Sequence, residues 1–245
     1  MSADFNPLFV HLLELRTRLV RVALVFLLAF MGCFYFSGTL YDVLVAPLAA
    51  VLPGQKLVSI GIASPFLLQM KIAGMAAFVL TLPHTLYQTW AFVAPGLYAH
   101  EKRLVLPLVL SSTLLFLAGM AFAYFLVFDK VFRFVAGVVP ASMQWLPDSG
   151  EYLDFVLGMF LAFGFTFEVP VAVVLLVHLG MVSVAQLRQW RPYVIVGAFV
   201  VAAVVTPPDV ISQFMLAMPL WLLFELGCLI ANWVVRPVGS KQLQP

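Results

Sequence analysis

Long apolar runs, separated by short polar segments, constrain this chain more than any other feature of its sequence. Only 10% of its 245 residues are charged, and 64% are hydrophobic. A soluble domain usually carries about 25% charged residues, so this chain has too little polar material to cover a surface in water. A spanning helix needs about 20 mostly apolar residues. We therefore expect an all-α polytopic membrane protein, with a single integral membrane domain over residues 1–245.

Six runs qualify as membrane spans, and the last two are the weakest. The predicted spans cover residues 19–36, 64–92, 104–128, 152–179, 193–206 and 210–235. The fifth has about 14 residues and would rise about 21 Å, less than a hydrocarbon core of about 30 Å. Polar and helix-bending residues interrupt the sixth, namely Gln213, Pro219 and Glu225. We therefore expect the last two spans to be short.

The segments 37–62 and 129–151 are too broken by proline, glycine and charge to be spans. We expect both to be extracytoplasmic, and the first to hold a short interfacial helix near Tyr41–Leu52. Arginines before the first apolar run superficially resemble the start of a signal peptide. Because five more apolar runs follow, we interpret the first as an uncleaved span.

Basic residues indicate the orientation of the chain. Six spans put both termini on one side, and that side carries nine basic residues: Arg16, Arg18, Arg21, Lys102, Arg103, Arg188, Arg191, Arg236 and Lys241. The opposite side carries three, which are Lys56, Lys130 and Arg133. Since cytoplasmic segments carry an excess of Lys and Arg, we expect both termini in the cytoplasm.

A polar segment, residues 92–103, interrupts the apolar pattern between the second and third spans. The orientation above places it in the cytoplasm. Its Glu101 is suited to binding a basic peptide, because a carboxylate accepts both arms of an arginine fork. A carboxylate at a helix start is also favoured by the helix dipole, so a capping role for Glu101 is the alternative.

Glu14 lies just before the first span, on a segment whose leucines at positions 8, 12, 15 and 19 mark one face of an amphipathic helix. The neighbouring arginines are typical of an interfacial anchor with solvated charges. Glu14 fits that interpretation less well, because an acid works against the local basic character.

Glu168 stands near the middle of the fourth span, where an ionisable group is expensive and a function is the default hypothesis. A neutral Glu168 hydrogen-bonded to a neighbouring helix is the alternative. Pro170 has no N–H, so it should free the carbonyl of Thr166 and bend the helix. Farther along, Asp209 and Gln213 can share one helix face, although capping of the sixth span is the simpler role for Asp209.

Motifs for enzymatic or metal chemistry are absent from the sequence. His100 and Glu101 begin a zinc-binding pattern that no second histidine completes. Neither a nucleophile elbow nor a phosphate-binding loop occurs. The two cysteines lie in apolar runs and are typical of packing residues. The net charge of +2 is too small to indicate binding to nucleic acid. We therefore expect a protein that is not an enzyme and has no cofactor or metal.

Eight short stretches, in order and on a six-span layout, resemble the TatC family, the core receptors of the twin-arginine protein translocase. They are His11–Arg16, Ala63–Phe66, Tyr87–Tyr98, His100–Arg103, Gly119–Tyr124, Phe163–Pro170, Arg191–Tyr193 and Thr206–Asp209. The resemblance implies a cupped six-helix bundle in the bacterial cytoplasmic (inner) membrane. It also implies export of folded precursors with twin-arginine signal peptides, driven by the proton-motive force, in an oligomeric complex with the single-span subunits TatA and TatB.

The resemblance assigns roles to individual residues. Signal-peptide binding falls on Glu14, Arg16, Phe92, Glu101 and Arg103. Further functional positions are the intramembrane Glu168, together with Pro47, Thr206, Asp209 and Gln213, the last being tied to docking of a partner helix. A proton-coupled transporter or channel with Glu168 as its ion site is the alternative, although the first three spans supply few polar groups for a path across the membrane.

Overall fold

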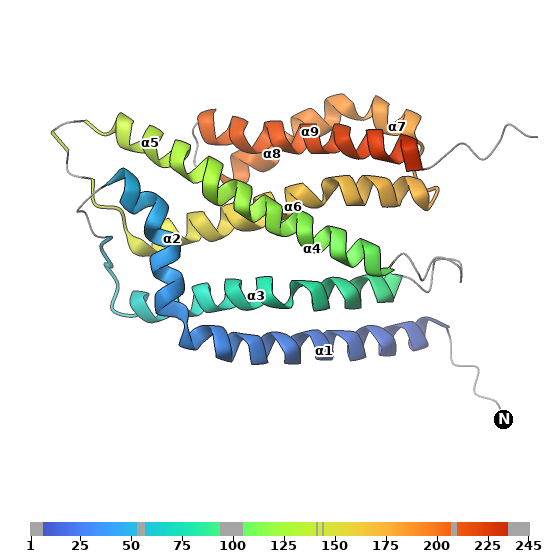
Figure 1. Ribbon diagram of the computed structural model, residues 1–245, viewed down its shortest axis with the longest axis horizontal. Coiled ribbons are helices and arrows are strands. Elements are labelled where there is room, and N and C mark those ends of the chain that lie inside the picture. Colours follow the sequence, from blue (N-terminus) through green and yellow to red (C-terminus); the bar gives the residue numbers. More distant parts are fainter. Residues whose placement is uncertain are drawn as a thin grey trace, which may run out of the picture. The chain divides into compact units, whose positions relative to one another are not determined.

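The computed structural model describes residues 7–52, 57–93, 105–140, 142–143, 145–206 and 210–234. The regular elements in these ranges are helices, apart from an isolated bridge between Val58 and Asp148 (Figure 1). They are α1 (Pro7–Tyr35), α2 (Ser37–Val51), α3 (Ser64–Val93), α4 (Val105–Phe122), the π-helix η3 (Ala123–Val127), α5 (Phe128–Val138), α6 (Ser149–His178), α7 (Val184–Gln189), α8 (Arg191–Val205) and α9 (Val210–Val234). The predicted all-α membrane fold is confirmed.

Five helical stretches of the described chain are long and apolar enough to cross a membrane. They are His11–Tyr35, Ser64–Phe92, Leu106–Val138, Ser149–His178 and Val210–Trp233. The predicted fifth span corresponds to α8, an apolar helix of 15 residues. It is short, as its sequence indicates. A short helix, α2, is also present where the sequence predicts one.

Two compact units make up the chain. Unit 1 consists of Met1–Leu117 and Val135–Leu157, and unit 2 of Ala118–Phe134 and Gly158–Pro245. Helices α4, α5 and α6 contribute residues to both units. The two units are described in turn below.

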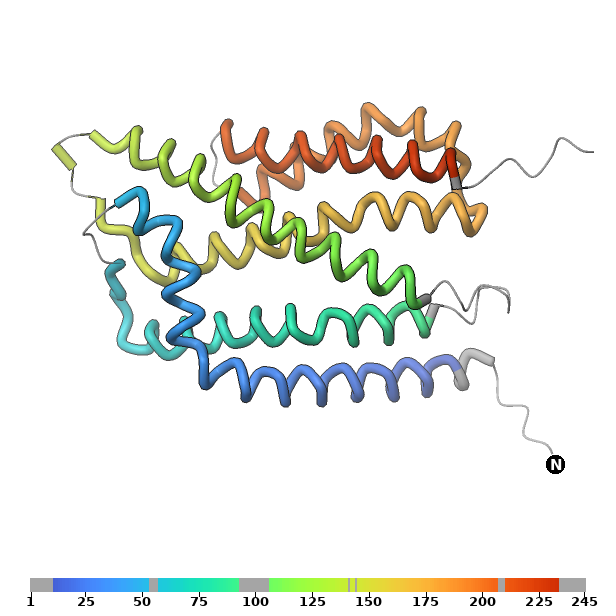
Figure 2. Tube along the Cα trace, in the orientation of Figure 1, coloured from blue at the N-terminus to red at the C-terminus, as the bar shows by residue number. Residues whose placement is uncertain are grey.

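Unit 1 is built on the pairing of α1 with α3, which run side by side, while α2 turns steeply away from α1 (Figure 2). Apolar side chains of α2 cover a buried cluster from α3 and the start of α6, formed by Leu68, Ile72 and Leu153. The Tyr152 hydroxyl donates to the Leu44 carbonyl at 2.7 Å. Helix α2 is therefore held to the first turns of α3 and α6 by apolar packing and by a hydrogen bond.

A hydrogen-bonded cap fixes where α6 begins. The Asp148 carboxylate accepts from the backbone N–H groups of Gly150 at 2.8 Å and Glu151 at 3.1 Å. A side-chain oxygen in this position satisfies N–H groups that have no partner within the helix. The adjoining Ser149 N–H donates to the Val58 carbonyl at 2.8 Å, which ties the segment before α3 to the same point.

Unit 2 depends on close approaches of other helices to α6. A Cβ atom added at Gly119 of α4 would lie 2.4 Å from the Phe163 carbonyl oxygen. One added at Gly227 of α9 would lie 2.9 Å from the Pro170 Cα. Small residues let helix backbones come together in this way, and close packing is a main source of helix association in membranes. Both glycines therefore serve packing.

Two predicted span boundaries differ from the helices of the structure. The helix of the first span begins at Pro7, so the amphipathic segment with Glu14 is part of α1. The third helix does not end at Phe128. It continues through η3 and α5 to Val138, and Asp129 pairs with Arg133 at 2.7 Å on its exposed side. These charges suggested a loop, but they share one face of a continuing helix.

The sixth span is neither broken nor short. Helix α9 runs for 25 residues through Pro219, which is about 37 Å. Neighbouring groups can satisfy the backbone carbonyl that proline frees in a spanning helix. Glu225 pairs with Arg191 at 2.6 Å, so its charge is compensated within unit 2. Counting polar residues as interruptions was therefore the error.

Substituting Gly119→Ala should lower the thermal unfolding temperature of the purified protein in detergent. The new methyl group would meet backbone of α6, which cannot rotate away, and such overpacking typically costs about 1–3 kcal/mol. Gly197→Ala is the matched control, because a Cβ there meets no described atom within 4 Å. Equal stability of the two variants would contradict the close-packing role of Gly119.

Candidate functional site

The N-terminal part of α1 carries an acid held by an arginine. Arg18, one turn after Glu14, donates to the Glu14 Oε1 atom from Nε at 3.0 Å and from Nη2 at 2.6 Å. The Glu14 side chain is 34% exposed and that of Arg18 is 20% exposed. The carboxylate is therefore oriented by a charge-assisted pair and is still accessible.

Helix α3 completes this arrangement. The third nitrogen of the Arg18 guanidinium, Nη1, donates to Gln88 Oε1 at 3.1 Å. Gln88 is only 7% exposed, so it is a buried acceptor that faces α1. One arginine thus links two residues on two helices. We call Glu14, Arg18 and Gln88 the Glu14 cluster.

An aromatic contact lies at the same end of the α1–α3 pair. The rings of His11 and Phe92 stack with their centroids 4.2 Å apart and their planes 19° apart. Phe92 is the second-to-last residue of α3, so the start of α1 and the end of α3 lie beside each other. The structure therefore brings together two of the predicted binding residues, Glu14 and Phe92. Arg16, also predicted, is exposed on the same part of α1.

Three other predicted site residues, Glu101, Arg103 and Asp209, lie outside the described residues. Their assignments remain predictions.

The predicted intramembrane polar residues belong to unit 2. Glu168 is half-buried on α6, between the buried Thr166 and Pro170. Thr206 is buried at the C-terminal end of α8, where its hydroxyl donates to the Ala202 carbonyl at 2.8 Å. Gln213 is half-buried in the first turns of α9. The Thr206 hydroxyl therefore has a local capping role.

Pro47, which the resemblance marks as a functional position, belongs to the segment where a short helix was expected. It lies inside α2, next to the buried Leu48. In a helix of 15 residues that packs on α3 and α6, Pro47 sits in the structured cap of unit 1.

Sequence reasoning missed two members of the Glu14 cluster. The spacing of Glu14 and Arg18 by four residues is a known signal for an ion pair on a helix, and it could have identified Arg18. Gln88 gave no comparable signal, since it lies 70 positions from Arg18 and only the packing of α1 on α3 brings them together.

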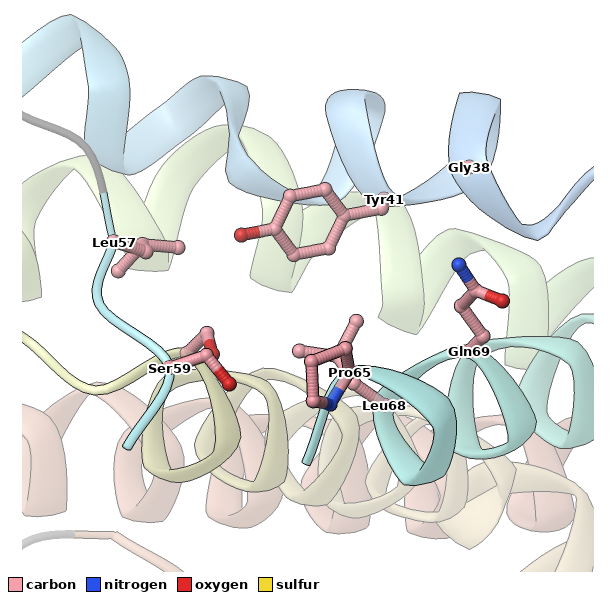
Figure 3. Close-up of a pocket in the computed structure, with 8 residues that line it drawn as sticks. Gly38, Tyr41, Leu57, Ser59, Pro65, Leu68 and Gln69 are labelled. Carbon is pink, nitrogen blue, oxygen red and sulfur yellow. The ribbon is translucent and has the colours of Figure 1, made fainter. Parts of the chain in front are cut away.

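A second region in unit 1 is a cavity of about 220 Å³ next to α2. Figure 3 shows the Tyr41 side chain above Pro65, with its hydroxyl directed toward Leu57. Burial and the nearby Asp42 charge raise the pKa of Tyr41 above its ordinary value. The lining residues are Gly38, Tyr41, Leu57, Ser59, Pro65, Leu68, Gln69 and Ser149. None is an acid or a base of the kind that would bind a charged peptide.

Among the residues that the structure describes, no group of three or more His, Cys, Asp or Glu side chains is placed to hold a metal ion.

Comparison with known proteins gives one consistent result. The family model for "Sec-independent protein translocase protein (TatC)" matches residues 10–219. A protein of that name from Azotobacter chroococcum is 55% identical over 222 residues, 90% of this chain and 87% of the relative. The Escherichia coli K12 protein of the same name is 48% identical over 240 residues, 98% of this chain and 93% of the relative.

A solved structure has the same fold. A crystal structure described as the twin-arginine translocase receptor TatC superimposes with a TM-score of 0.81 at 36% sequence identity. The superposition covers 92% of this chain and 100% of that chain.

The Asp148 carboxylate that caps α6 should make the stability of the fold depend on pH. Hydrogen bonds from the backbone of Glu151, and then of Gly150 and Ile60, hold the pKa of the Asp148 carboxyl below its ordinary value. A lowered pKa stabilises the fold above the pKa of the unfolded chain, and this contribution is lost as pH falls through the folded-state pKa. Asp148→Asn, which keeps a capping oxygen without a charge, should therefore be less stable than the wild type near pH 7 and approach it near pH 3. Thermal unfolding of both proteins between pH 3 and pH 7 measures this. A difference in unfolding temperature that stays constant over this range would contradict the role of the Asp148 charge.

Proposed function

This chain belongs to the TatC family of Sec-independent protein translocase proteins, and we propose that its Glu14 cluster is part of the site that binds the arginine pair of a twin-arginine signal peptide. It is a multi-pass membrane protein and the receptor subunit of a twin-arginine translocase. In the proposed cycle, it recognises the signal peptide of a folded precursor, and the precursor then crosses the membrane at the expense of the proton-motive force.

The observation that carries the proposed site is the accessible, oriented carboxylate of Glu14 at the junction of α1 and α3. Arginine is always charged and presents a planar fork of donors that matches a carboxylate. A hydrogen bond to a charged group contributes about 1.5–3 kcal/mol, or roughly ten- to hundredfold in binding. Both hydrogen bonds from Arg18 to Glu14 end on Oε1, so we propose that a peptide arginine approaches the carboxylate from the side of Oε2.

Two adjacent arginines need a second acceptor, and we assign it to Glu101. Helix α3 ends at Val93, next to the residue whose ring stacks on His11. The segment that carries Glu101 and Arg103 therefore continues from the end of unit 1 that holds Glu14. With Arg16 and Phe92, these residues form the proposed peptide site. The apolar part of the signal peptide then lies along the membrane-spanning helices.

Positively charged residues favour one orientation. We propose that both termini, and with them the Glu14 cluster, face the cytoplasm of a bacterial cell, where precursor proteins are made. The cap formed by α2, which contains Pro47, then lies on the opposite side of the membrane.

A translocase receptor works within a complex, and we propose that its partners are the single-span subunits TatA and TatB. The α8–α9 hairpin is the proposed docking region, because the short α8 should thin the bilayer locally and its neighbourhood holds Thr206, Asp209 and Gln213. Glu168 is proposed to act in assembly or transport after the peptide has bound. The chain is proposed to have no catalytic activity of its own, and the comparisons give no support to a proton-coupled transporter.

Replacing Glu101 by alanine should strongly weaken binding of a twin-arginine peptide while the protein still inserts and purifies normally. Loss of one charge-assisted acceptor should weaken binding by about tenfold or more. Fluorescence anisotropy with a labelled signal peptide measures this. Glu151→Ala is the control, an exposed acid at the start of α6. Unchanged affinity of Glu101→Ala would remove Glu101 from the site.

Replacing Glu168 by alanine should leave peptide affinity within about twofold, because it removes no acceptor for the arginine pair. Transport of a folded precursor into membrane vesicles should nevertheless be lost. Measuring both properties in the same preparations separates binding from the later step. A fall in peptide affinity equal to that of Glu101→Ala would contradict separate roles for the two acids.

A further inference from the structure

The Glu14 carboxylate already has an arginine bound to it from within the chain. Arg18 directs two donors at Glu14 Oε1, at 2.6 and 3.0 Å, and a third at Gln88 Oε1, at 3.1 Å. Its side chain is 80% covered. A cation that approaches Glu14 therefore meets an acid whose charge is balanced by a well-held guanidinium.

Lysine and arginine differ in how they can compete with such a resident group. An ammonium group is a compact and strongly hydrated point charge, whereas a guanidinium is weakly hydrated and binds through a planar fork. A lysine ammonium would have to lose its hydration and displace the two hydrogen bonds from Arg18 to Glu14, and it could not replace them with a planar pair of donors. An arginine can replace the bonds that it breaks with bonds of the same geometry.

Gln88 makes the exchange possible without leaving Arg18 unpartnered. It is buried and accepts from Nη1, the nitrogen of Arg18 that does not touch Glu14. When a peptide arginine takes the carboxylate, Arg18 keeps this third bond. The cost of releasing Glu14 is therefore limited to the two bonds that the incoming arginine replaces.

We propose, resting on the proposed function of this site, that Arg18 determines its specificity: it is an internal competitor for Glu14 that another guanidinium displaces and a lysine ammonium does not. Arg18 acts through Glu14 and does not itself bind the peptide. Selectivity for arginine then comes from the resident guanidinium as well as from the acid.

A purely structural role for Arg18 makes a different prediction. If Arg18 only fastened α1 to α3, its loss would weaken the binding of every peptide by the same factor. The ratio of affinities for two peptides is therefore the informative quantity, because a general loss of structure does not change it.

The test uses the full-length protein in detergent and two labelled signal peptides that differ only in an Arg-Arg or Lys-Lys pair. We expect Arg18→Gln to bind the Lys-Lys peptide more tightly than the wild type does. The ratio of the affinities for the Arg-Arg and Lys-Lys peptides should fall by about tenfold, the effect of one charge-assisted hydrogen bond. Arg18→Lys, which keeps the charge and loses the fork, should narrow it in the same direction. Because Arg18→Lys keeps a cation beside Glu14, the ratio of affinities can be measured with this variant if Arg18→Gln does not fold.

The matched control is Arg21→Gln, which removes an exposed arginine three residues farther along α1. It lowers the positive charge near the site equally, so it should shift both affinities alike and leave their ratio unchanged. The proposal is overturned if Arg18→Gln and Arg18→Lys keep the wild-type ratio, or if Arg21→Gln narrows it as much. A Glu14→Gln variant that still binds the Arg-Arg peptide with wild-type affinity would instead overturn the proposed function of the site.

Discussion

A charge at or within a membrane must be compensated by the protein, and ion pairs among the described residues meet this requirement. Two ion pairs in the described part of the chain join different helices, Lys71 with Asp154 and Arg191 with Glu225. The Glu14–Arg18 pair lies within α1 and is linked to α3 through the hydrogen bond from Arg18 to Gln88. Removing one partner of such a pair leaves the other charge exposed to an apolar medium. These pairs therefore fix helices to each other, and the Glu14 cluster does so while keeping part of its acid accessible.

Apolar packing supplies the rest of the scaffold, and its closest contacts require glycine. Gly119 and Gly227 let α4 and α9 meet the backbone of α6 in unit 2, and the ring of Phe122 packs on Phe163 with centroids 5.5 Å apart. In unit 1 the α1–α3 pair depends on larger side chains and on the Arg18 bridge. The proposed binding site is thus built on a helix pair joined through polar groups, whereas the proposed docking region adjoins a tightly packed apolar core.

Much of this fold can be predicted from sequence, since apolar runs locate helices wherever lipid or a core surrounds them. The errors arose where charge was taken as a sign of a loop. Asp129 and Arg133 pair on the exposed side of α5 while Phe128, Val131 and Phe132 are buried, so this segment is an amphipathic helix. Glu225 likewise has its partner on another helix. Glu14 could be identified from its unusual context, but its contact through Arg18 to Gln88 depends on tertiary packing that no local pattern reveals.

The central claim, that the N-terminal end of α1 receives the arginine pair, is tested most directly by photocrosslinking. A photoreactive amino acid would replace the exposed Thr17, beside Arg18, or, as a control, Leu28, which is 71% exposed in the middle of the same helix. We predict that position 17 crosslinks to signal-peptide residues next to the twin-arginine pair and that position 28 does not. A peptide with Lys-Lys in place of Arg-Arg should crosslink to position 17 with a lower yield. Equal yields at both positions, or a yield at position 17 that does not depend on the arginines, would contradict the account.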